Sequence, residues 1–359
     1  MTPGFWNGKR VLVTGHTGFK GGWLSLWLSR LGARVTGYAL APPTEPSLFV
    51  AAGVAEGIVS MEGDIRDYGA LAACFAEARP EVVFHLAAQP LVRASYDDPV
   101  ETFETNVLGT VHVLEAARHA LNLRVVINVT SDKCYENQEW PWGYRESDRL
   151  GGKDPYSGSK ACAEMVASVY ANSFFDRGRT AGPVTLASVR AGNVLGGGDW
   201  GADRLLPDLA RVLAAGGRPL IRNPDSIRPW QHVLDPLAGY LALAEALWTG
   251  GRDYAGPWNF GPAVDDARPV RWLADGFCDA WGDAAHWLDA REDDAPPEAR
   301  VLKLDCSRAR SLLGWAPRLP LADALGWTVE WYRDFYAGKD MVTRTLAQIE
   351  RYATLGEAP

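Results

Sequence analysis

The fold is decided by residues 10–32, RVLVTGHTGFKGGWLSLWLSRLG. Arg10–Thr14 is a short apolar run of the kind that forms a buried parallel strand. The segment Trp23–Leu31 has apolar residues at helical spacing, and Gly32 is placed to end that helix. A second apolar run, Arg34–Leu40, begins directly afterwards. The order strand, helix, strand predicts the β-α-β unit of a doubly wound parallel sheet.

Three glycines occupy the turn between the first strand and the helix, in the pattern G-x-x-G-x-x-G. Gly15 permits the tight turn, Gly18 lets a diphosphate approach backbone N–H groups at the helix N-terminus, and Gly21 lets helix and strand pack closely. Because the motif follows a strand and precedes a helix, it predicts a dinucleotide site. The expected cofactor contacts in this loop are Gly15, Thr17, Gly18, Phe19, Lys20 and Gly21.

The end of the second strand lacks the residue that usually selects the cofactor. A carboxylate there would bind the adenosine ribose hydroxyls of NAD, and a nearby arginine would favour NADP. Residues 37–43, GYALAPP, contain neither. This segment therefore leaves the choice between NAD and NADP open, and it suggests that the cofactor is held less tightly than usual.

Two further strand ends supply candidate cofactor contacts. Asp64 follows the third strand and could accept a hydrogen bond from the adenine amino group, or alternatively cap the next helix. Val82–Leu86 is expected to be the fourth strand, and the small residues after it suit a backbone that lies against the cofactor ribose. The expected contacts of this group are Asp64, Ile65, Leu86, Ala87 and Ala88.

The fifth strand and the helix after it carry the chemistry. Val125–Val129 is a buried strand that opens into Thr130, Ser131, Asp132 and Lys133. Pro155 begins a helix on which Tyr156 and Lys160 share one face. A Y-x-x-x-K spacing alone is common by chance. Beside this strand end, however, it predicts a proton-transfer site.

Composition excludes several classes of function. The net charge is −8 with no run of Lys or Arg, which argues against a nucleic-acid surface. Five cysteines without paired spacing indicate reduced thiols, and they form neither a disulfide frame nor a metal site. We find no signal-peptide pattern and no segment of membrane-spanning length. We therefore expect a cytoplasmic enzyme without a metal or a membrane contact.

Composition changes after Arg190, where a glycine-rich stretch is followed by polar, proline-containing segments. The predicted fold is α/β, a doubly wound parallel Rossmann sheet with a smaller C-terminal α/β lobe that binds substrate. We expect the dinucleotide-binding domain over residues 1–190 and the second domain over 191–359, with about 230–260 returning to the first. We also expect one long helix over Val100–Asn122, with Asn106 as a structural bridge to the active-site strand.

These motifs resemble the extended short-chain dehydrogenase/reductase family, also called the NAD-dependent epimerase/dehydratase family, along nearly the whole chain. The matching strings are GHTGFKG at 15–21, TSDKCYEN at 130–137, WGYRE at 142–146 and RAGNVLGGGDW at 190–200. Within the family they are most similar to nucleotide-sugar 4,6-dehydratases. The resemblance implies NAD as the cofactor and a CDP-glucose-type nucleotide sugar as the substrate. The alternatives are an epimerase, a dehydratase for another nucleotide, or a non-catalytic dinucleotide sensor.

The implied reaction is an internal redox cycle. A hydride leaves carbon 4 of the glucose, the carbon-5 proton and the carbon-6 hydroxyl are eliminated, and the hydride returns to carbon 6. Tyr156 would be the base for the 4-hydroxyl, with its phenol pKa lowered by the Lys160 cation and the positive nicotinamide. Lys160 would also bind the nicotinamide ribose. Ser131 would hydrogen-bond the reacting oxygen, and a protonated Asp132 would donate to the departing hydroxyl.

Lys133 departs from the family pattern, because most other 4,6-dehydratases have Glu at this position as the carbon-5 base. A lysine can serve only if it is neutral, which needs burial or neighbouring cations. The alternative is that Lys133 is a charge partner of Asp132 or Glu136.

The remaining expectations concern substrate and assembly. Arg228 is the leading candidate for the substrate diphosphate, with amide contacts from Asn193. Arg190, Arg204 and Arg222 are weaker candidates that could instead form ion pairs. The full set of expected substrate contacts is Gln89, Ser131, Asn193, Arg204 and Arg228. The resemblance also implies a homo-oligomer, a dimer through helices 100–122 and 156–177 or a tetramer.

Overall fold

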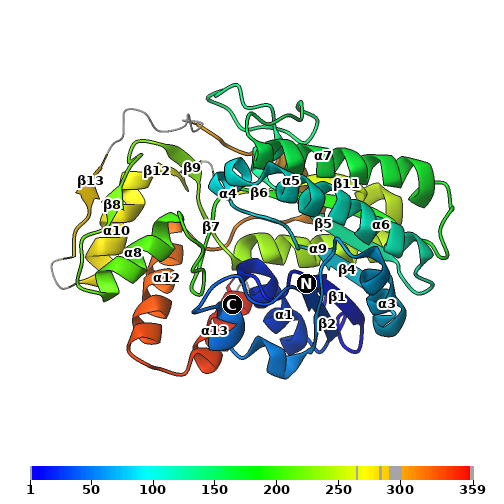
Figure 1. Ribbon diagram of the computed structural model, residues 1–359, viewed down its shortest axis with the longest axis horizontal. Coiled ribbons are helices and arrows are strands. Elements are labelled where there is room, and N and C mark those ends of the chain that lie inside the picture. The colour runs from blue at the N-terminus through cyan, green and yellow to red at the C-terminus, as the bar shows by residue number, and fades with distance from the viewer. Residues whose placement is uncertain (1, 264–265, 283–284, 291–300, 356–359) are drawn as a thin grey trace.

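A seven-stranded parallel sheet forms the centre of the computed structural model, which describes residues 2–263, 266–282, 285–290 and 301–355 (Figure 1). From β1 the chain adds β2 and β3 on one side, then returns to add β4, β5, β6 and β11 on the other. The predicted α/β doubly wound fold is confirmed. The strands, in sheet order, are β3 (Val59–Glu62), β2 (Arg34–Ala39), β1 (Arg10–Thr14), β4 (Val82–His85), β5 (Val125–Val129), β6 (Thr185–Ala191) and β11 (Gly256–Phe260).

The strand order reverses between β1 and β4, and ligands of such sheets bind outside the carboxyl ends of the strands at that point. Thr14 ends β1 and pairs in register with His85 of β4. The Thr14 hydroxyl lies 2.8 Å from Nδ1 of His85 and accepts the backbone N–H groups of Leu86 and Ala87, each at 3.2 Å. The two strand ends that border the crevice are therefore tied to each other.

Successive side chains of each strand point to opposite faces of the sheet, so the hydrophobic core has two layers. Val11 and Val13 of β1 join a core cluster with the tryptophans of α1, whereas Leu12 joins a second cluster with residues of α3 and α6. This is the period of two that a strand buried on both faces requires. Helices α1 (Phe19–Arg30) and α9 (Leu234–Gly250) cover one face, and α3 (Tyr68–Ala78), α6 (Gly109–His119) and α7 (Pro155–Tyr170) cover the other.

The helix expected over Val100–Asn122 is interrupted, so that prediction is corrected. It consists of α5 (Pro99–Phe103), a π-helical turn (Glu104–Leu108) and α6 (Gly109–His119). Asn106 lies in the π turn, where its side chain accepts from the N–H of Gln89 at 2.8 Å and donates to the hydroxyl of Ser159 at 2.9 Å. The extra residue of a π turn re-aims side chains, and here it turns Asn106 toward the loop after β4 and toward α7. Asn106 therefore forms a structural bridge, as expected. Its partners lie in the loop after β4 and in α7, whereas the expected partner was the active-site strand.

Helices α8, α10 and α12 contact one another, and Figure 1 shows them gathered at the end of the molecule away from β1–β3. Both α9 and β11, which lie late in the sequence, pack on or within the main sheet. The division of the chain at residue 190 stays a prediction. Further helices are α2 (Leu48–Ala51), α4 (Val92–Asp97), α8 (Leu205–Ala214), α10 (Val270–Trp281), α11 (Ser307–Leu313), α12 (Leu321–Tyr336) and α13 (Met341–Thr354).

Three two-stranded sheets complete this part of the fold: β7 with β10, β9 with β12, and β8 with β13. Their bounds are β7 (Val194–Leu195), β8 (Leu220–Ile221), β9 (Ile227–Pro229), β10 (Gln231–His232), β12 (Ala267–Pro269) and β13 (Leu288–Asp289). Within the described ranges, every helix is too short or too polar to cross a bilayer.

Candidate active site

The carboxyl end of β5 turns sharply so that three polar side chains follow one another. Ser131 begins a short 3₁₀ turn, Asp132–Cys134, and its hydroxyl accepts the N–H of Lys133 at 3.2 Å. The same hydroxyl donates to Oδ1 of Asp132 at 3.1 Å. Serine caps such a turn readily because its side chain competes for nearby backbone N–H groups. Ser131 and Asp132 are buried, and Lys133 is half-buried.

Helix α7 presents Tyr156 and Lys160 to this turn. Asp154 caps the helix by accepting the N–H of Ser157 at 2.9 Å, and Pro155 occupies the first helical position. The N–H of Tyr156 donates to Ser95 of α4 at 3.1 Å, which orients the first turn. The ammonium of Lys160 lies 3.5 Å from the carbonyl oxygen of Val129, the last residue of β5. The predicted strand end and the Tyr–Lys pair are thus brought together.

Burial opposes charge on both members of this pair. It raises the pKa of the Tyr156 phenol to about 12, while a hydrogen bond with Ser131 acts in the opposite direction. Burial lowers the pKa of the Lys160 ammonium to about 8, while Cys134 and Glu164 nearby act to raise it. A positive nicotinamide ring at this place would favour the phenolate. The prediction that Lys160 lowers the pKa of Tyr156 is corrected: burial raises that pKa overall, and the lowering contributions come from Ser131 and Arg204.

Asp132 has the environment that a neutral carboxylic acid needs. Burial raises its pKa, while Lys133 and the hydrogen bond from Ser131 act to lower it. Its Oδ2 is buried and has no hydrogen-bond partner in the described part of the chain. A Cβ added at Gly192 would lie 3.2 Å from that oxygen, so the glycine keeps space open there. A protonated Oδ2 could donate to a ligand hydroxyl.

Lys133 lies on the same side of the site as Tyr156, with its ammonium 5.9 Å from the centroid of the tyrosine ring. Of the two charge partners considered for Lys133, Glu136 already forms an ion pair with Arg149 at 3.2 Å. Asp132 is the acidic neighbour whose pKa the Lys133 charge affects. The geometry is thus compatible with Lys133 as a base and with Lys133 as a partner of Asp132.

The glycine turn forms a cradle for a dinucleotide. Gly15 has φ +79, and a Cβ at Gly21 would lie only 2.1 Å from the carbonyl oxygen of Gly15. Gly18 precedes α1, and a Cβ there would meet only that same oxygen, at 3.4 Å, so space remains open before the helix N-terminus. Thr17 donates to the carbonyl oxygen of Leu40 at 2.9 Å, which ties the turn to the end of β2. These residues fit a bound diphosphate.

His16 of the glycine turn packs against β2. Its ring packs over Gly37, where a Cβ would lie 2.2 Å from the ring, and its Nε2 lies 2.7 Å from the hydroxyl of Ser60. Burial lowers the pKa of His16 to about 4, so the ring is neutral at pH 7. Sequence reasoning missed His16, although its place inside the glycine motif was a signal.

Two of the predicted contacts are already engaged within the protein. Asp64 binds Arg66 through both carboxylate oxygens, each at 2.8 Å, and Asp67 is the residue that caps α3. The capping alternative for Asp64 is therefore wrong. The amide nitrogen of Gln89 donates to Leu91 at 3.0 Å and to Thr102 at 2.9 Å, so both of its donor positions are used. Contacts of Asp64 with adenine and of Gln89 with substrate stay predictions.

Lys20 extends from the cofactor loop into the catalytic neighbourhood. Burial lowers its pKa to about 8, with a further lowering by Arg204 and opposing effects from Asp132. The charges of Lys20 and Asp132 therefore affect each other. The motifs place Lys20 in the cofactor loop and Asp132 at the catalytic strand end. The assignment of Lys20 to the cofactor stays a prediction.

The arginines expected near the substrate divide into two groups. Arg228 of β9 is buried, and its charge acts to lower the pKa of Asp132. Arg204 forms an ion pair with Asp199 at 2.6 Å, and its charge acts on Tyr156. Asn193 lies directly before β7 and is half-buried. Their contacts with substrate stay predictions.

The other two arginines form the ion pairs considered as alternatives. Arg190 binds Glu164 in the core at 2.8 Å, and Arg222 binds Asp203 at 2.9 Å.

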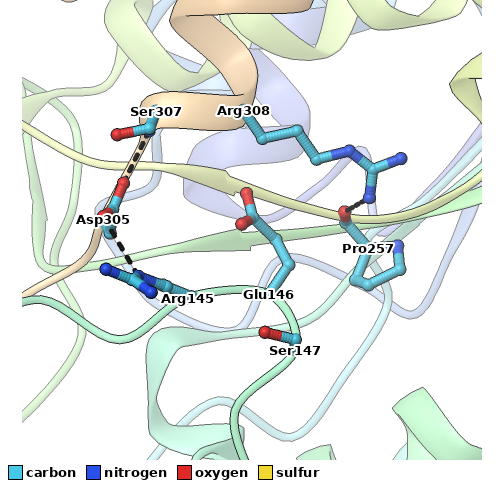
Figure 2. A pocket seen from close by; sticks show the side chains of 7 residues that line it. All are labelled: Arg145, Glu146, Ser147, Pro257, Asp305, Ser307 and Arg308. Atoms are coloured by element: carbon cyan, nitrogen blue, oxygen red, sulfur yellow. Dashed lines mark hydrogen bonds and ion pairs between the residues drawn. The ribbon is translucent and has the colours of Figure 1, made fainter.

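A surface cavity of about 510 Å³ is lined by a different set of residues (Figure 2). Arg308 donates to the carbonyl oxygen of Pro257 at 2.7 Å on one side, and burial raises the pKa of Glu146. None of the predicted site residues lines it. The lining residues are Arg145, Glu146, Ser147, Pro257, Asp305, Ser307 and Arg308. Among the described residues, no group of three or more His, Cys, Asp or Glu side chains is placed to hold a metal ion.

A doubly wound sheet with a glycine cradle at its switch point, and a Tyr–Lys helix beside an acidic strand end, define a dinucleotide-dependent enzyme. The chain belongs to the NAD dependent epimerase/dehydratase family, whose model matches residues 11–255. Family membership confirms the resemblance inferred from the motifs, and it confirms NAD as the cofactor.

Individual relatives agree with this assignment. The chain is 54% identical over 349 residues to CDP-glucose 4,6-dehydratase of Salmonella typhimurium, with 97% of each chain covered. The solved UDP-glucose 4-epimerase of Thermus thermophilus, a complex with NAD, has a TM-score of 0.77 and 25% identity, covering 90% of this chain and 99% of that one. A dTDP-glucose 4,6-dehydratase variant of Streptomyces venezuelae has a TM-score of 0.75 at 24% identity, covers 93% of this chain and 99% of that one, and shows the fold alone.

Proposed function

We propose that the chain is a lyase that converts CDP-D-glucose to CDP-4-dehydro-6-deoxy-D-glucose with NAD as its cofactor. The observation that carries the proposal is the turn Ser131–Lys133 beside Tyr156 and Lys160. An oxidation at carbon 4 needs only the Tyr–Lys pair, whereas an elimination also needs an acid and a base, and this turn adds a buried carboxyl and an amine. The high identity to a CDP-glucose 4,6-dehydratase supports CDP-glucose as the substrate.

Each proton transfer of the reaction is assigned to one side chain of the site. Bound at the glycine cradle, NAD supplies reversible hydride chemistry. Tyr156 takes the proton of the 4-hydroxyl, and Ser131 hydrogen-bonds the same oxygen. Asp132, whose pKa is raised by burial, gives its proton in the neutral form to the departing carbon-6 hydroxyl. Lys133, in its neutral form, removes the carbon-5 proton, which is acidified once carbon 4 is a ketone. Carbon 5 regains a proton when carbon 6 accepts the hydride.

Charge near the strand end supports a diphosphate-linked substrate. Arg228 and Lys20 both affect the pKa of Asp132, so two cations accompany the acid in the site. Arg228 binds the diphosphate and Asn193 adds amide contacts, since planar guanidinium groups match phosphate oxygens well.

The proposal is tested by incubating the enzyme and NAD separately with CDP-, UDP-, dTDP- and GDP-glucose. We expect the alkali-induced absorbance of a 4-keto-6-deoxy sugar with CDP-glucose and no net NADH. Conversion of the glucose to its 4-epimer would identify an epimerase instead. Net NADH would identify a simple dehydrogenase, and turnover only with another nucleotide would change the substrate.

The exposed faces of two neighbouring helical segments support a homodimer. Val100, Phe103 and Leu108 on α5 and its π turn are 66%, 40% and 51% exposed, and Met165 and Val169 on α7 are 52% and 58% exposed. The segments contact each other, and Figure 1 shows α5 and α7 together on one side of the sheet. A second copy of the chain covers this apolar face in a four-helix interface, and a tetramer would add a further interface.

The enzyme acts in the cytoplasm, in deoxysugar and O-antigen biosynthesis.

A further inference from the structure

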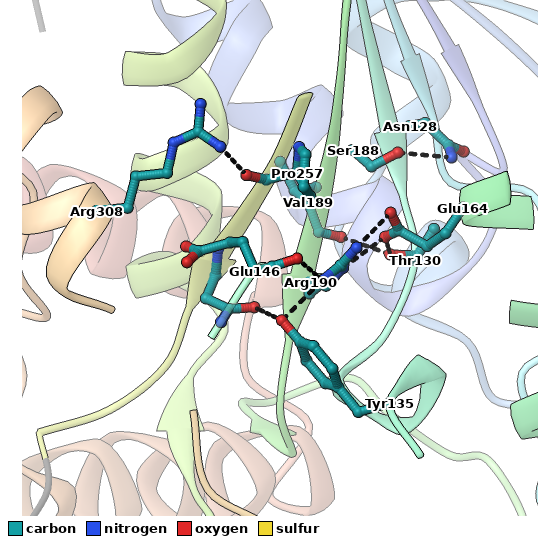
Figure 3. Close-up of polar contacts among 11 residues, drawn as sticks. Asn128, Thr130, Tyr135, Glu146, Glu164, Ser188, Val189, Arg190, Pro257 and Arg308 are labelled. Carbon is teal, nitrogen blue, oxygen red and sulfur yellow. Dashed lines mark hydrogen bonds and ion pairs between the residues drawn. The ribbon is translucent and has the colours of Figure 1, made fainter. Parts of the chain in front are cut away.

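Glu164 continues the helical stripe that carries the catalytic pair. Tyr156, Lys160 and Glu164 are spaced four residues apart on α7, so their side chains leave the same face. Glu164 is only 5% exposed and binds Arg190 of β6, itself 2% exposed, through two parallel hydrogen bonds of 2.9 and 2.8 Å (Figure 3). A fully buried carboxylate and guanidinium are costly unless paired in this way.

The buried pair reaches both ends of the catalytic turn. On one side the hydroxyl of Thr130, the residue before Ser131, donates to Glu164 at 2.5 Å. On the other side Arg190 donates to the hydroxyl of Tyr135, the residue after Cys134, at 2.8 Å. The turn that holds Ser131, Asp132 and Lys133 is therefore attached to one ion pair at each end.

The attachment extends beyond the pair to fixed backbone. Tyr135 donates to Asn259 of β11 at 2.7 Å, and Asn259 in turn donates to the carbonyl oxygen of Tyr144 at 2.8 Å. Arg190 also donates to the carbonyl oxygen of Glu146 at 3.1 Å. Through these bonds the turn, α7, β6 and β11 are held to one another.

We propose that Glu164 and Arg190 are positioning residues that fix the Ser131–Asp132–Lys133 turn relative to Tyr156 and Lys160. The inference rests on the proposed function for its catalytic consequence. The pair itself does not touch the reacting atoms. The pair fixes the positions of Asp132 and Lys133 relative to the helix that carries Tyr156 and Lys160. Displacing a catalytic group by about 1 Å can lower the rate on the order of a hundredfold.

Variants of the pair itself would leave a buried charge unpaired and could prevent folding. The test therefore uses Thr130→Val and Tyr135→Phe, which remove one attachment each and leave the ion pair intact. Ser188→Ala is the matched control. Ser188 of β6 accepts from Asn128 of β5 at 3.2 Å, on the same two strands but one step farther from the catalytic end (Figure 3).

The first readout is kinetic. Thr130→Val and Tyr135→Phe should each lower kcat about tenfold or more with KM for CDP-glucose changed less than about twofold. Because both act on one turn, their losses should not multiply in the double variant. Ser188→Ala loses one buried hydrogen bond, whereas the Thr130 and Tyr135 hydroxyls each make two, so it should lower Tm by a smaller amount and keep kcat. Equal kcat in Thr130→Val and Ser188→Ala would show that the network is purely structural and would overturn the proposal.

The second readout needs no substrate. Backbone amides of Lys133–Tyr135 should exchange with solvent deuterium faster in Thr130→Val and Tyr135→Phe than in the wild type, and at the wild-type rate in Ser188→Ala. Equal acceleration in Ser188→Ala, or none in the two test variants, would overturn the proposal. Should the wild type fail to convert CDP-glucose, the proposed function falls, while the exchange comparison still decides the positioning role.

Discussion

The ammonium of Lys133 lies 5.9 Å from the centroid of the Tyr156 ring. The candidate carbon-5 base and the candidate base for the 4-hydroxyl therefore share one side of the site. A substrate bound with carbon 4 against Tyr156 and carbon 5 on the Lys133 side would have one candidate base beside each reacting position. The relationship makes the order of proton transfers testable.

Lys133→Met and Asp132→Asn should stop the reaction at different steps. Without the amine, oxidation at carbon 4 should still form enzyme-bound NADH, but solvent deuterium should not enter carbon 5. With Asn at 132, carbon 5 should exchange while the carbon-6 hydroxyl is seldom lost, because exchange needs only the base whereas elimination needs base and acid together. Mass spectrometry of recovered sugar measures both. Wild-type carbon-5 exchange in Lys133→Met would leave Lys133 an electrostatic partner of Asp132.

Lys160 should make stability depend on pH in a defined direction. Burial depresses its pKa from 10.5 to about 8, so between these values the unfolded chain binds the proton that the folded protein has lost. The cost of burying the charged ammonium, on the order of 3 kcal/mol, is fully present below about pH 8 and disappears as pH rises toward 10.5.

The cofactor-free Lys160→Met variant should therefore be more stable than the wild type at pH 7, and this advantage should vanish near pH 10.5. Denaturant unfolding at both pH values measures the difference. A stability difference that stays constant between the two pH values would show that Lys160 keeps its ordinary pKa in the folded protein.

Leu40 offers a test of the missing acid after β2. It is 54% exposed, and its carbonyl oxygen accepts from Thr17 of the glycine turn, whereas Ala39 is buried. The wild type should purify with less than one NAD per chain. Leu40→Asp should lower the Kd for NAD about tenfold through a charge-assisted hydrogen bond to ribose hydroxyls, and the uncharged Leu40→Asn should change it little. Wild-type protein saturated with NAD that dialysis cannot remove would argue that other contacts already replace the acid.

Val169 tests the dimer face. It is 58% exposed on α7, and Val169→Glu would place a charge in the apolar interface. Sedimentation velocity should show dissociation to monomers at concentrations where the wild type is dimeric. The control is Val50→Glu on α2, at a valine that is 73% exposed and lies off this face. Identical sedimentation of wild type and Val169→Glu would place the interface elsewhere.

Local patterns predicted well those parts of the fold and site that local chemistry determines. The strand Arg10–Thr14 was found with the bounds expected, because an unbroken apolar run followed by Gly15 leaves few alternatives. Tyr156 and Lys160 lie near the end of β5 because α7 is the next long helix in the chain after that strand, and Lys160 contacts the carbonyl oxygen of Val129. The four-residue spacing was informative because it was combined with the polar strand end before it.

Features that depend on contacts distant in sequence could not be predicted. The π turn carries Asn106, which binds Gln89 and Ser159, and no periodicity in the sequence shows that an extra residue is accommodated there. Arg190 resembled a phosphate ligand until Glu164 was seen to fill its donors. In both cases the sequence shows a polar side chain but does not show which residue it will bond to.

The central claim is that hydride leaves carbon 4 and returns to carbon 6 within one active site. It is tested most directly with CDP-glucose that carries deuterium at carbon 4, in ordinary water, with the product examined by NMR. The account predicts a 4-keto product with that deuterium on carbon 6 and no net NADH. Product without deuterium at carbon 6, or deuterium retained at carbon 4 in an epimerised sugar, would contradict it.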